Sequence, residues 1–382
     1  MLIHTFEVKT QVTKELYKAI AKELWKRGEC RKGEKQGEIE YYGHRFCGIR
    51  IRLVMTGKSE YVRYDVIYVI APCRLLDPDN YLGLFDTDGA DRVIDEIDFR
   101  LKSVCPLLPD IQTCDLSRVD YTVNAVMKNR KQVEAYVNFA RQSRLPMHMK
   151  VHAVYDKKSK RRKISEDGYT VFTEKDYHNV EVTIYDKYRE MCKENDKKNK
   201  PVFPEGASVK AKNVLRMEIR LKKHKINNLV KKHGTYSLRD FLLQSDSIVS
   251  DVTADYLTQM IPCETVRTLS DARKIIAEST LNAEKKQKLT AFVETVSVKR
   301  STQKAIDAYK TAGKQDEAKK CMKALAKLDV NPIIAKEKTM VVFDGHVPTP
   351  VELWNRALSE YEWTEDAYVL RIGKRKKRKK AT

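Results

Sequence analysis

Three segments of the chain carry polar side chains on alternate residues, the spacing that places side chains on one face of a β-strand. These segments are 116–124, 180–187 and 214–222, and mostly apolar residues fill the positions between. Strand by strand, the polar positions are Arg118, Asp120, Thr122 and Asn124, then Glu181, Thr183, Tyr185 and Lys187, then Arg216, Glu218, Arg220 and Lys222. We therefore expect three strands that each have one core face and one ionic face.

An acid stands among bases or hydroxyl groups on each of these ionic faces. If the strands lie in one sheet, Asp120, Glu181 and Glu218 converge, and their charges repel unless a cation lies among them. Carboxylate oxygens suit Mg²⁺ or Mn²⁺, and the surrounding Arg and Lys suit a phosphate backbone. The alternative is a solvated face, because antiparallel sheets often leave one side in water. The spacing alone leaves both interpretations open.

A tyrosine shares the second of these faces. Tyr185 has Glu181 and Lys187 on the same side of its strand, and a tyrosine there is able to attack a phosphodiester and form a phosphotyrosine. A free phenol has a pKa near ~10, so it needs a neighbouring cation or base to react at neutral pH. Tyr169 and Tyr177 are rival nucleophiles nearby. The alternative is a packing role, since tyrosine is common in sheets.

Composition narrows the class of partner. Lys and Arg number 74 against 53 Asp and Glu, a formal net charge of +21 over 382 residues. This excess favours a polyanion, with nucleic acid first and an anionic membrane surface second. No apolar run approaches the ~20 residues of a membrane span, so we expect no membrane partner. The eight cysteines form no CxxC pair, and nothing indicates secretion, which favours reduced thiols in a cytoplasm.

The remaining pattern predicts an α+β fold, a central antiparallel sheet with flanking helices, followed by a helical region. Helical spacing marks 12–28, 90–107 and 130–143, whereas strand spacing marks 39–71, 115–124, 150–156, 169–173, 179–187 and 214–222. After about residue 230 the chain reads almost entirely as helix. We expect an α+β domain over 1–230, a helical region over 231–370 and a basic tail over 371–382. No internal repeat is visible in the sequence.

The order of the polar strands resembles a known family. Arg118-Val119-Asp120, Tyr185-Asp186-Lys187 and Arg216-Met217-Glu218-Ile219-Arg220 are similar to the strands of filamentous-phage gene II replication proteins and, more distantly, of plasmid rolling-circle initiators. Upstream and downstream segments extend the resemblance over roughly 38 to 335. Position 217 departs from the family, because it is Met where an aromatic residue is expected. The His-hydrophobe-His metal motif of the broader superfamily is also missing, and His148 and His152 are weak substitutes.

The resemblance implies a rolling-circle replication initiator, a metal-dependent endonuclease that nicks one DNA strand and later religates it. Tyr185 is then the nucleophile, assisted by Lys187, and Asp120 and Glu218 are the expected metal ligands. Glu181 joins them only through its position on the same face. The alternatives are a conjugative-mobilisation relaxase with the same chemistry and a non-catalytic nucleic-acid-binding regulator, which has no need of Tyr185.

Single-stranded or origin DNA is the expected partner, with a host replication helicase as a second partner in a bacterial cytoplasm. The predicted DNA contacts lie on the ionic strands and in the basic stretch 157–163. They are Arg118, Arg216, Arg220, Lys222, Arg161 and Arg162. A second basic stretch at 198–212 and the tail 374–380 are expected to add affinity for DNA that does not depend on base sequence.

Overall fold

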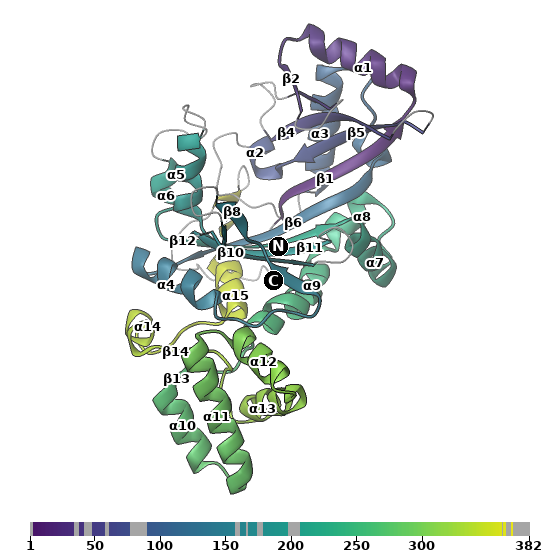
Figure 1. Cartoon of the computed structure of the whole chain (residues 1–382). Coiled ribbons are helices and arrows are strands. Elements are labelled where there is room, and N and C mark those ends of the chain that lie inside the picture. The colour runs from purple at the N-terminus through teal and green to yellow at the C-terminus, as the bar shows by residue number, and fades with distance from the viewer. Residues whose placement is uncertain are drawn as a thin grey trace, which may run out of the picture.

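The computed structural model describes residues 3–33, 38–41, 48–57, 61–76, 90–156, 161–165, 167–173, 179–197, 207–360, 362–363 and 368–369. Its centre is a single ten-stranded sheet with the strand order β2-β3-β4-β5-β1-β6-β12-β11-β10-β7 (Figure 1). Every pair of neighbouring strands in this sheet is antiparallel. The predicted fold class, an antiparallel sheet with flanking helices and a helical C-terminal part, is therefore confirmed.

The first half of the sheet comes from the N-terminal segment of the chain. Its strands are β1 (Ile3–Val12), β2 (Cys30–Lys32), β3 (Ile39–Tyr41), β4 (Ile49–Thr56) and β5 (Arg63–Ile70). Its helices are α1 (Lys14–Lys26), α2 (Pro72–Leu76) and α3 (Ala90–Val104). Helix α1 begins where the Thr13 hydroxyl accepts a hydrogen bond from the Leu16 amide, which satisfies one of the free amides of the first turn. Strand β1 was missed in the sequence, although it lies at the centre of the sheet.

The second half holds the three polar strands. Its strands are β6 (Asp115–Val126), β7 (Met149–Val151), β10 (Gly168–Thr173), β11 (Val180–Asp186) and β12 (Val214–Lys222). The helices between and after them are α4 (Arg130–Ala140), α5 (Lys187–Lys197), α6 (Ala207–Lys210) and α7 (Lys223–His233). A separate short hairpin joins β8 (Val154–Asp156) and β9 (Arg161–Lys163). Strand β12 lies between β6 and β11, so segments far apart in sequence become neighbours.

One face of the sheet is apolar and is covered by helices. In the second half, α4, α7 and α15 (Pro350–Glu360) lie against its strands, together with α8 (Leu238–Leu243) and α9 (Ser245–Met260) behind them. Their buried side chains and those of α1 and α3 form one continuous core with the apolar face. Burial of this face leaves the opposite face for the polar side chains, because successive residues of a strand alternate sides.

A second, smaller core belongs to the C-terminal helices. It is formed by α10 (Leu269–Glu278), α11 (Ala283–Lys299), α12 (Thr302–Thr311) and α13 (Gln315–Lys327). This bundle projects from the end of α4 and is linked by β13 (Arg267–Thr268), β14 (Ile334–Ala335) and α14 (Glu337–Val342) (Figure 1). The main core takes in residues on both sides of position 230, and the predicted domain boundary there stays a prediction. Among the described residues, no helix is both long enough and apolar enough to cross a membrane.

Candidate active site

Strands β6, β12 and β11 bring the predicted polar side chains together in three rows across the sheet. Directly opposed residues of neighbouring strands point to the same face. The rows are Asp120, Arg220 and Glu181, then Thr122, Glu218 and Thr183, then Asn124, Arg216 and Tyr185. The spacing of polar residues in the sequence therefore corresponds to one continuous polar face that contains acids, bases and a tyrosine.

The phenol of Tyr185 lies within this face and has a defined partner. Its Oη donates a hydrogen bond to Glu218 Oε1 over 2.8 Å, diagonally from one row to the next. Burial and then the charge of Glu218 raise the pKa of Tyr185 well above its usual value, while Arg216 acts in the opposite direction. The phenol is therefore protonated at neutral pH, and a carboxylate is in place to accept its proton.

Two buried cations lie beside the phenol and its carboxylate. The guanidinium of Arg216 is fully buried, with its Nε donating to Asn124 Oδ1 over 2.7 Å and its Nη1 3.9 Å from Glu218 Oε1. Lys187, 5% exposed, donates to Glu190 Oε2 over 2.7 Å. Burial, and then the charge of Arg216, lowers the pKa of Lys187 to about 8. Lys187 was expected on the strand, but β11 ends at Asp186, and Lys187 is the first residue of α5.

Arginine side chains are hydrogen bonded to Asp120, one of the carboxylates that were predicted to bind a metal ion. Asp120, 1% exposed, accepts from Arg118 through a 2.7 Å contact to Oδ2 and from Arg220 through a 2.9 Å contact to Oδ1. Arg220 also reaches Glu181 over 3.4 Å. A carboxylate offers about four lone-pair sites, and these two guanidinium groups take up those of Asp120.

The described residues consequently do not fit the predicted Mg²⁺ or Mn²⁺ site. Within those parts of the chain, no group of three His, Cys, Asp or Glu side chains is arranged to hold a metal ion. Asp120, Glu181 and Glu218 do lie on one face, but arginines rather than a metal ion balance their charge in this arrangement. Glu218 Oε1 accepts the hydrogen bond from the phenol of Tyr185 and lies 3.9 Å from Nη1 of Arg216.

A histidine that the sequence did not single out belongs to the same site. His4 lies in β1, where the pairing with β6 is irregular. Its neighbours Ile3 and Thr5 pair with Tyr121 and Asp120, and His4 falls between these two pairs. Burial and the nearby charges of Arg216 and Lys187 lower its pKa well below the usual value, so its imidazole is neutral at pH 7. The only local signal was the alternation of apolar residues in 3–12, which marks a strand but gives no reason to choose His4.

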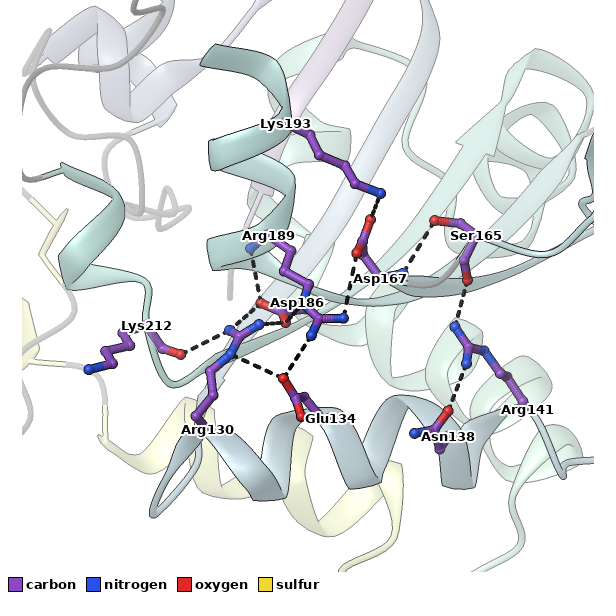
Figure 2. A network of polar contacts seen from close by, with 10 residues as sticks. All are labelled: Arg130, Glu134, Asn138, Arg141, Ser165, Asp167, Asp186, Arg189, Lys193 and Lys212. Atoms are coloured by element: carbon purple, nitrogen blue, oxygen red, sulfur yellow. Dashed lines mark hydrogen bonds and ion pairs between the residues drawn. The ribbon is translucent and has the colours of Figure 1, made fainter. Parts of the chain in front are cut away.

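A polar network anchors the residue between Tyr185 and Lys187. Asp186 is buried and accepts hydrogen bonds from both terminal nitrogens of Arg130 in α4, one of them 2.7 Å long, and from the amide of Arg189 in α5 over 3.1 Å. Figure 2 shows Arg130, Asp186, Arg189 and Glu134 as the centre of this network, with Asp167 and Lys193 beside it. The network fixes the point where β11 ends and α5 begins, and with it the directions of Tyr185 and Lys187.

The other candidates lie away from this cluster. Tyr169 is buried on the apolar face, where burial raises its pKa, and Tyr177 lies outside the described residues. His148 and His152 are exposed on either side of β7, and the ring of His152 packs 6.1 Å from that of Phe172. Arg161 and Arg162 belong to β9. Lys222 ends β12 beside Arg118, while residues 157–160, 198–206 and the tail 374–380 lie outside the described residues.

Comparison with known proteins places this arrangement in a family. Residues 26–240, more than half of the chain, match the family model for the N-terminal part of the gene II replication-associated protein. The chain therefore belongs to the gene II-type family of replication-associated proteins, which confirms the resemblance drawn from its sequence. The match spans β6, β11 and β12, and so takes in Asp120, Tyr185 and Glu218.

The other comparisons add little to this assignment. A rolling-circle replication initiator from Geobacillus stearothermophilus is among the similar solved structures, with 12% identity and a TM-score of 0.30, covering 66% of this chain and 84% of that one. A search of curated proteins finds no match.

Proposed function

We propose that the chain initiates rolling-circle replication by nicking one strand of origin DNA through Tyr185 and later rejoining the strand. The observation that carries this proposal is the 2.8 Å hydrogen bond from Tyr185 to Glu218, with Arg216 buried beside Glu218 and Lys187 buried within the field of both. Family membership supports the biological role, and the geometry supports the choice of nucleophile.

In the proposed reaction, Tyr185 Oη attacks the phosphorus of the scissile phosphodiester as its proton passes to Glu218. The new bond joins Oη to phosphorus, and the bond from phosphorus to the 3′ oxygen breaks. Lys187, whose pKa of about 8 leaves it mostly protonated at pH 7, donates a proton to the leaving oxygen, which becomes a 3′-OH. Arg216 stabilises the negative charge that develops, because a buried guanidinium is screened little by water. Religation is the reverse of these steps.

A divalent ion remains part of the proposal as an expectation from the family, with Mg²⁺ and Mn²⁺ as the candidates. Since the described carboxylates do not fit such an ion as they are arranged, no step is assigned to it. Arg118, Arg220 and Lys222 are the proposed contacts to the DNA backbone on this face, with Arg161 and Arg162 on the β8–β9 hairpin. Arg216 has no exposed surface, so its contact with DNA requires a phosphate that enters the site. The host helicase stays a predicted partner.

The test is a covalent-adduct assay with labelled single-stranded DNA that contains the element's own origin, run on a denaturing gel with and without Mg²⁺ or Mn²⁺. We expect an adduct band that disappears in Tyr185→Phe and falls by about 10²–10⁴-fold in Glu218→Gln, the usual contribution of a proton acceptor. Tyr169→Phe is the matched control, because this tyrosine lies on the neighbouring strand but faces the core.

The outcomes separate the alternatives. A band that persists in Tyr185→Phe means that another tyrosine is the nucleophile. If wild-type protein forms no band with the correct origin but still binds DNA, the non-catalytic regulator is the better description. A relaxase gives the same adduct, but on the transfer origin of a mobile element and not on a replication origin.

A further inference from the structure

A basic cavity is lined by the C-terminal bundle and the segment before α14, all beyond the end of the family match, and by Gln142 just after α4. It has a volume of about 620 Å³, within the range of nucleotide-sized sites. Its wall includes the start of α10, the end of α11 and the turn before α14. The charged and backbone groups that matter are Arg273, Arg300, Lys336, Glu337, Leu269 and Ser270.

Two of these cations face each other without an acidic partner. The charge of Arg300 is the first cause of a lowered pKa at Lys336, so the two lie within each other's field. Among the described residues, neither forms an ion pair, whereas Arg273 is bound by Glu294. Glu337 is the one acid in the cavity wall. Both side chains are exposed, so their mutual repulsion is weak, but the cavity wall carries more cations than acids, and such a concentration of positive charge attracts anions.

The backbone at Arg300 gives an independent indication. Helix α11 ends at Lys299, and the capping residue that follows it, Arg300, has a φ of 51° in the left-handed region. Glycine is the usual residue at such a position, because a side chain there is strained. Arg300 occupies this position despite the strain, and it lines the cavity next to Lys336. Among the described residues neither cation forms an ion pair, which indicates that the charge of Arg300 has a role. The amides of Leu269 and Ser270 lie in the first turn of α10, where amide hydrogens lack partners within the helix.

We infer that this cavity binds phosphate groups, and that its occupant is the backbone of DNA held outside the active site. The inference rests on the proposed function in that DNA is taken as the partner of the chain. Arg300 and Lys336 supply the charge, and Ser270 and the first-turn amides of α10 supply hydrogen-bond donors. No base edge is read here, so the cavity contributes affinity and position rather than sequence preference.

The experiment measures binding of the full chain to fluorescent origin DNA as a function of salt. The double variant Arg300→Gln and Lys336→Gln should reduce the slope of log affinity against log salt by the amount expected for about two phosphate contacts. It should also weaken binding roughly tenfold per contact near 0.1 M salt. The matched control is Lys320→Gln with Lys323→Gln, two exposed lysines of α13 outside the cavity wall. Equal losses in the two double variants would overturn the inference, since only overall charge would then matter.

A single substitution separates a binding role from a structural one. Arg300→Gly relieves the left-handed backbone, so we expect the melting temperature to rise while DNA binding weakens; Arg300→Lys should retain most of the binding. A rise in melting temperature without any loss of binding contradicts the inference. Another outcome would assign the cavity to a free nucleotide and overturn the DNA backbone as its occupant. In that outcome a nucleoside triphosphate competes for the cavity of the wild type, the Arg300→Gln and Lys336→Gln variant loses this competition, and DNA binding of the variant is unchanged.

The two proposals fail independently. Adduct formation on a short oligonucleotide that spans only the nick should be the same in wild type and in the Arg300→Gln and Lys336→Gln variant. If Tyr185 does not form the adduct of the proposed function, the comparison of DNA binding between the variants still tests the cavity. Conversely, an unchanged salt dependence in the cavity variant leaves the nicking chemistry untouched.

Discussion

The two halves of the sheet have the same order of strands and different chemistry. The first half runs β1, α1, β2 to β5, then α2 and α3; the second runs β6, α4, then β7, β10 and β11, then α5 and α6 before β12 and α7. In each half the last strand returns to pair with the first, β5 with β1 and β12 with β6. Strands β1 and β6 pair antiparallel in the middle (Figure 1). The halves are therefore related as an approximate internal repeat, which the sequence did not reveal.

Both halves carry ion pairs on the same face of the sheet. In the first half Arg52 contacts Glu38 over 2.5 Å and Glu7 over 3.6 Å, and in the second Arg220 contacts Asp120 over 2.9 Å and Glu181 over 3.4 Å. In the first set Arg52 of β4 reaches β1 and the residue just before β3, and in the second set Arg220 of β12 reaches β6 and β11. Alternating charges on strands are thus a feature of the whole face and do not by themselves mark an active site.

What the second half adds is a reactive group with buried neighbours. Tyr185 is hydrogen bonded to Glu218, Arg216 is fully buried, and Lys187 has a pKa of about 8. Among the described residues, the first half has no such set on its ionic face. The comparison therefore favours the row of Tyr185 and Arg216 as the place of the proposed chemistry, while the acids of the Asp120 row are paired with arginines.

The largest expected difference between the halves follows from removing the central arginine of each network. Arg220→Gln and Arg52→Gln each take a guanidinium from a buried carboxylate, so both should lower the free energy of unfolding by about 2–4 kcal/mol. Only Arg220→Gln should also slow adduct formation, by about 10-fold or more, because Asp120 and Arg118 then shift beside the site. Denaturant unfolding and the adduct assay measure the two effects. An equal loss of adduct formation in Arg52→Gln would mean that the Arg52 network supports the site as much as the Arg220 network does.

The next prediction concerns pH and tests Lys187 as the proton donor. The rate of a single nicking turnover should be level below pH 8 and fall about tenfold per unit above it, as Lys187 loses its proton. Lys187→Arg should lower the rate and remove this fall, because arginine stays protonated throughout the range and therefore does not donate the proton. The measurement is adduct formation between pH 6 and 10, and a fall that persists in Lys187→Arg assigns the titration to another group.

Unfolding does not explain such a fall. The pKa of Lys187 is lower in the folded chain than in the unfolded chain, so between about 8 and 10.5 the unfolded chain binds more protons. Stability from this group therefore rises with pH over that window, and it is below pH 8 that the buried charge costs stability. The activity and the stability should change in opposite directions above pH 8.

The sequence predicted the polar face but not which acid, base or hydroxyl group on it each polar side chain would contact. The alternation of polar and apolar residues in 116–124, 180–187 and 214–222 was sufficient to predict this face. Each strand has a buried apolar face, and its burial fixes the side on which the polar residues lie. The position of β12 between β6 and β11 depends on the return of a distant segment, which no local pattern encodes. His4 was missed for the same reason, since it joins the site only through the pairing of β1 with β6.

Two further features depended on contacts remote in sequence. Lys187 was expected on the strand, yet the chain turns into α5 at that residue, where Asp186 is held by Arg130, which lies 56 residues earlier. The metal site was expected from three converging acids and stays a prediction, whereas the pairing of Arg118 and Arg220 with Asp120 was not foreseen. Arginines were visible in the sequence, but which acid each would bind was not.

The smallest expected effect comes from a close approach behind Tyr185. Gly168 in β10 lies directly opposite Tyr185, and a Cβ added to it would lie 2.9 Å from the Tyr185 Cβ. Gly168→Ala should therefore displace Tyr185 and cost about 1–3 kcal/mol of stability, as overpacking does. We expect adduct formation to slow by about 10-fold, because small displacements of a reacting group are costly.

The matched variant in the first half is Gly33→Ala, whose added Cβ would meet the side chain of Glu38. It should lower stability by a similar amount and leave adduct formation unchanged, because Glu38 belongs to the Arg52 network and not to the Tyr185 row. Thermal unfolding and the adduct assay on both variants decide the matter. If Gly168→Ala forms adduct at the wild-type rate, the position of Tyr185 in the resting protein is not the one from which it reacts.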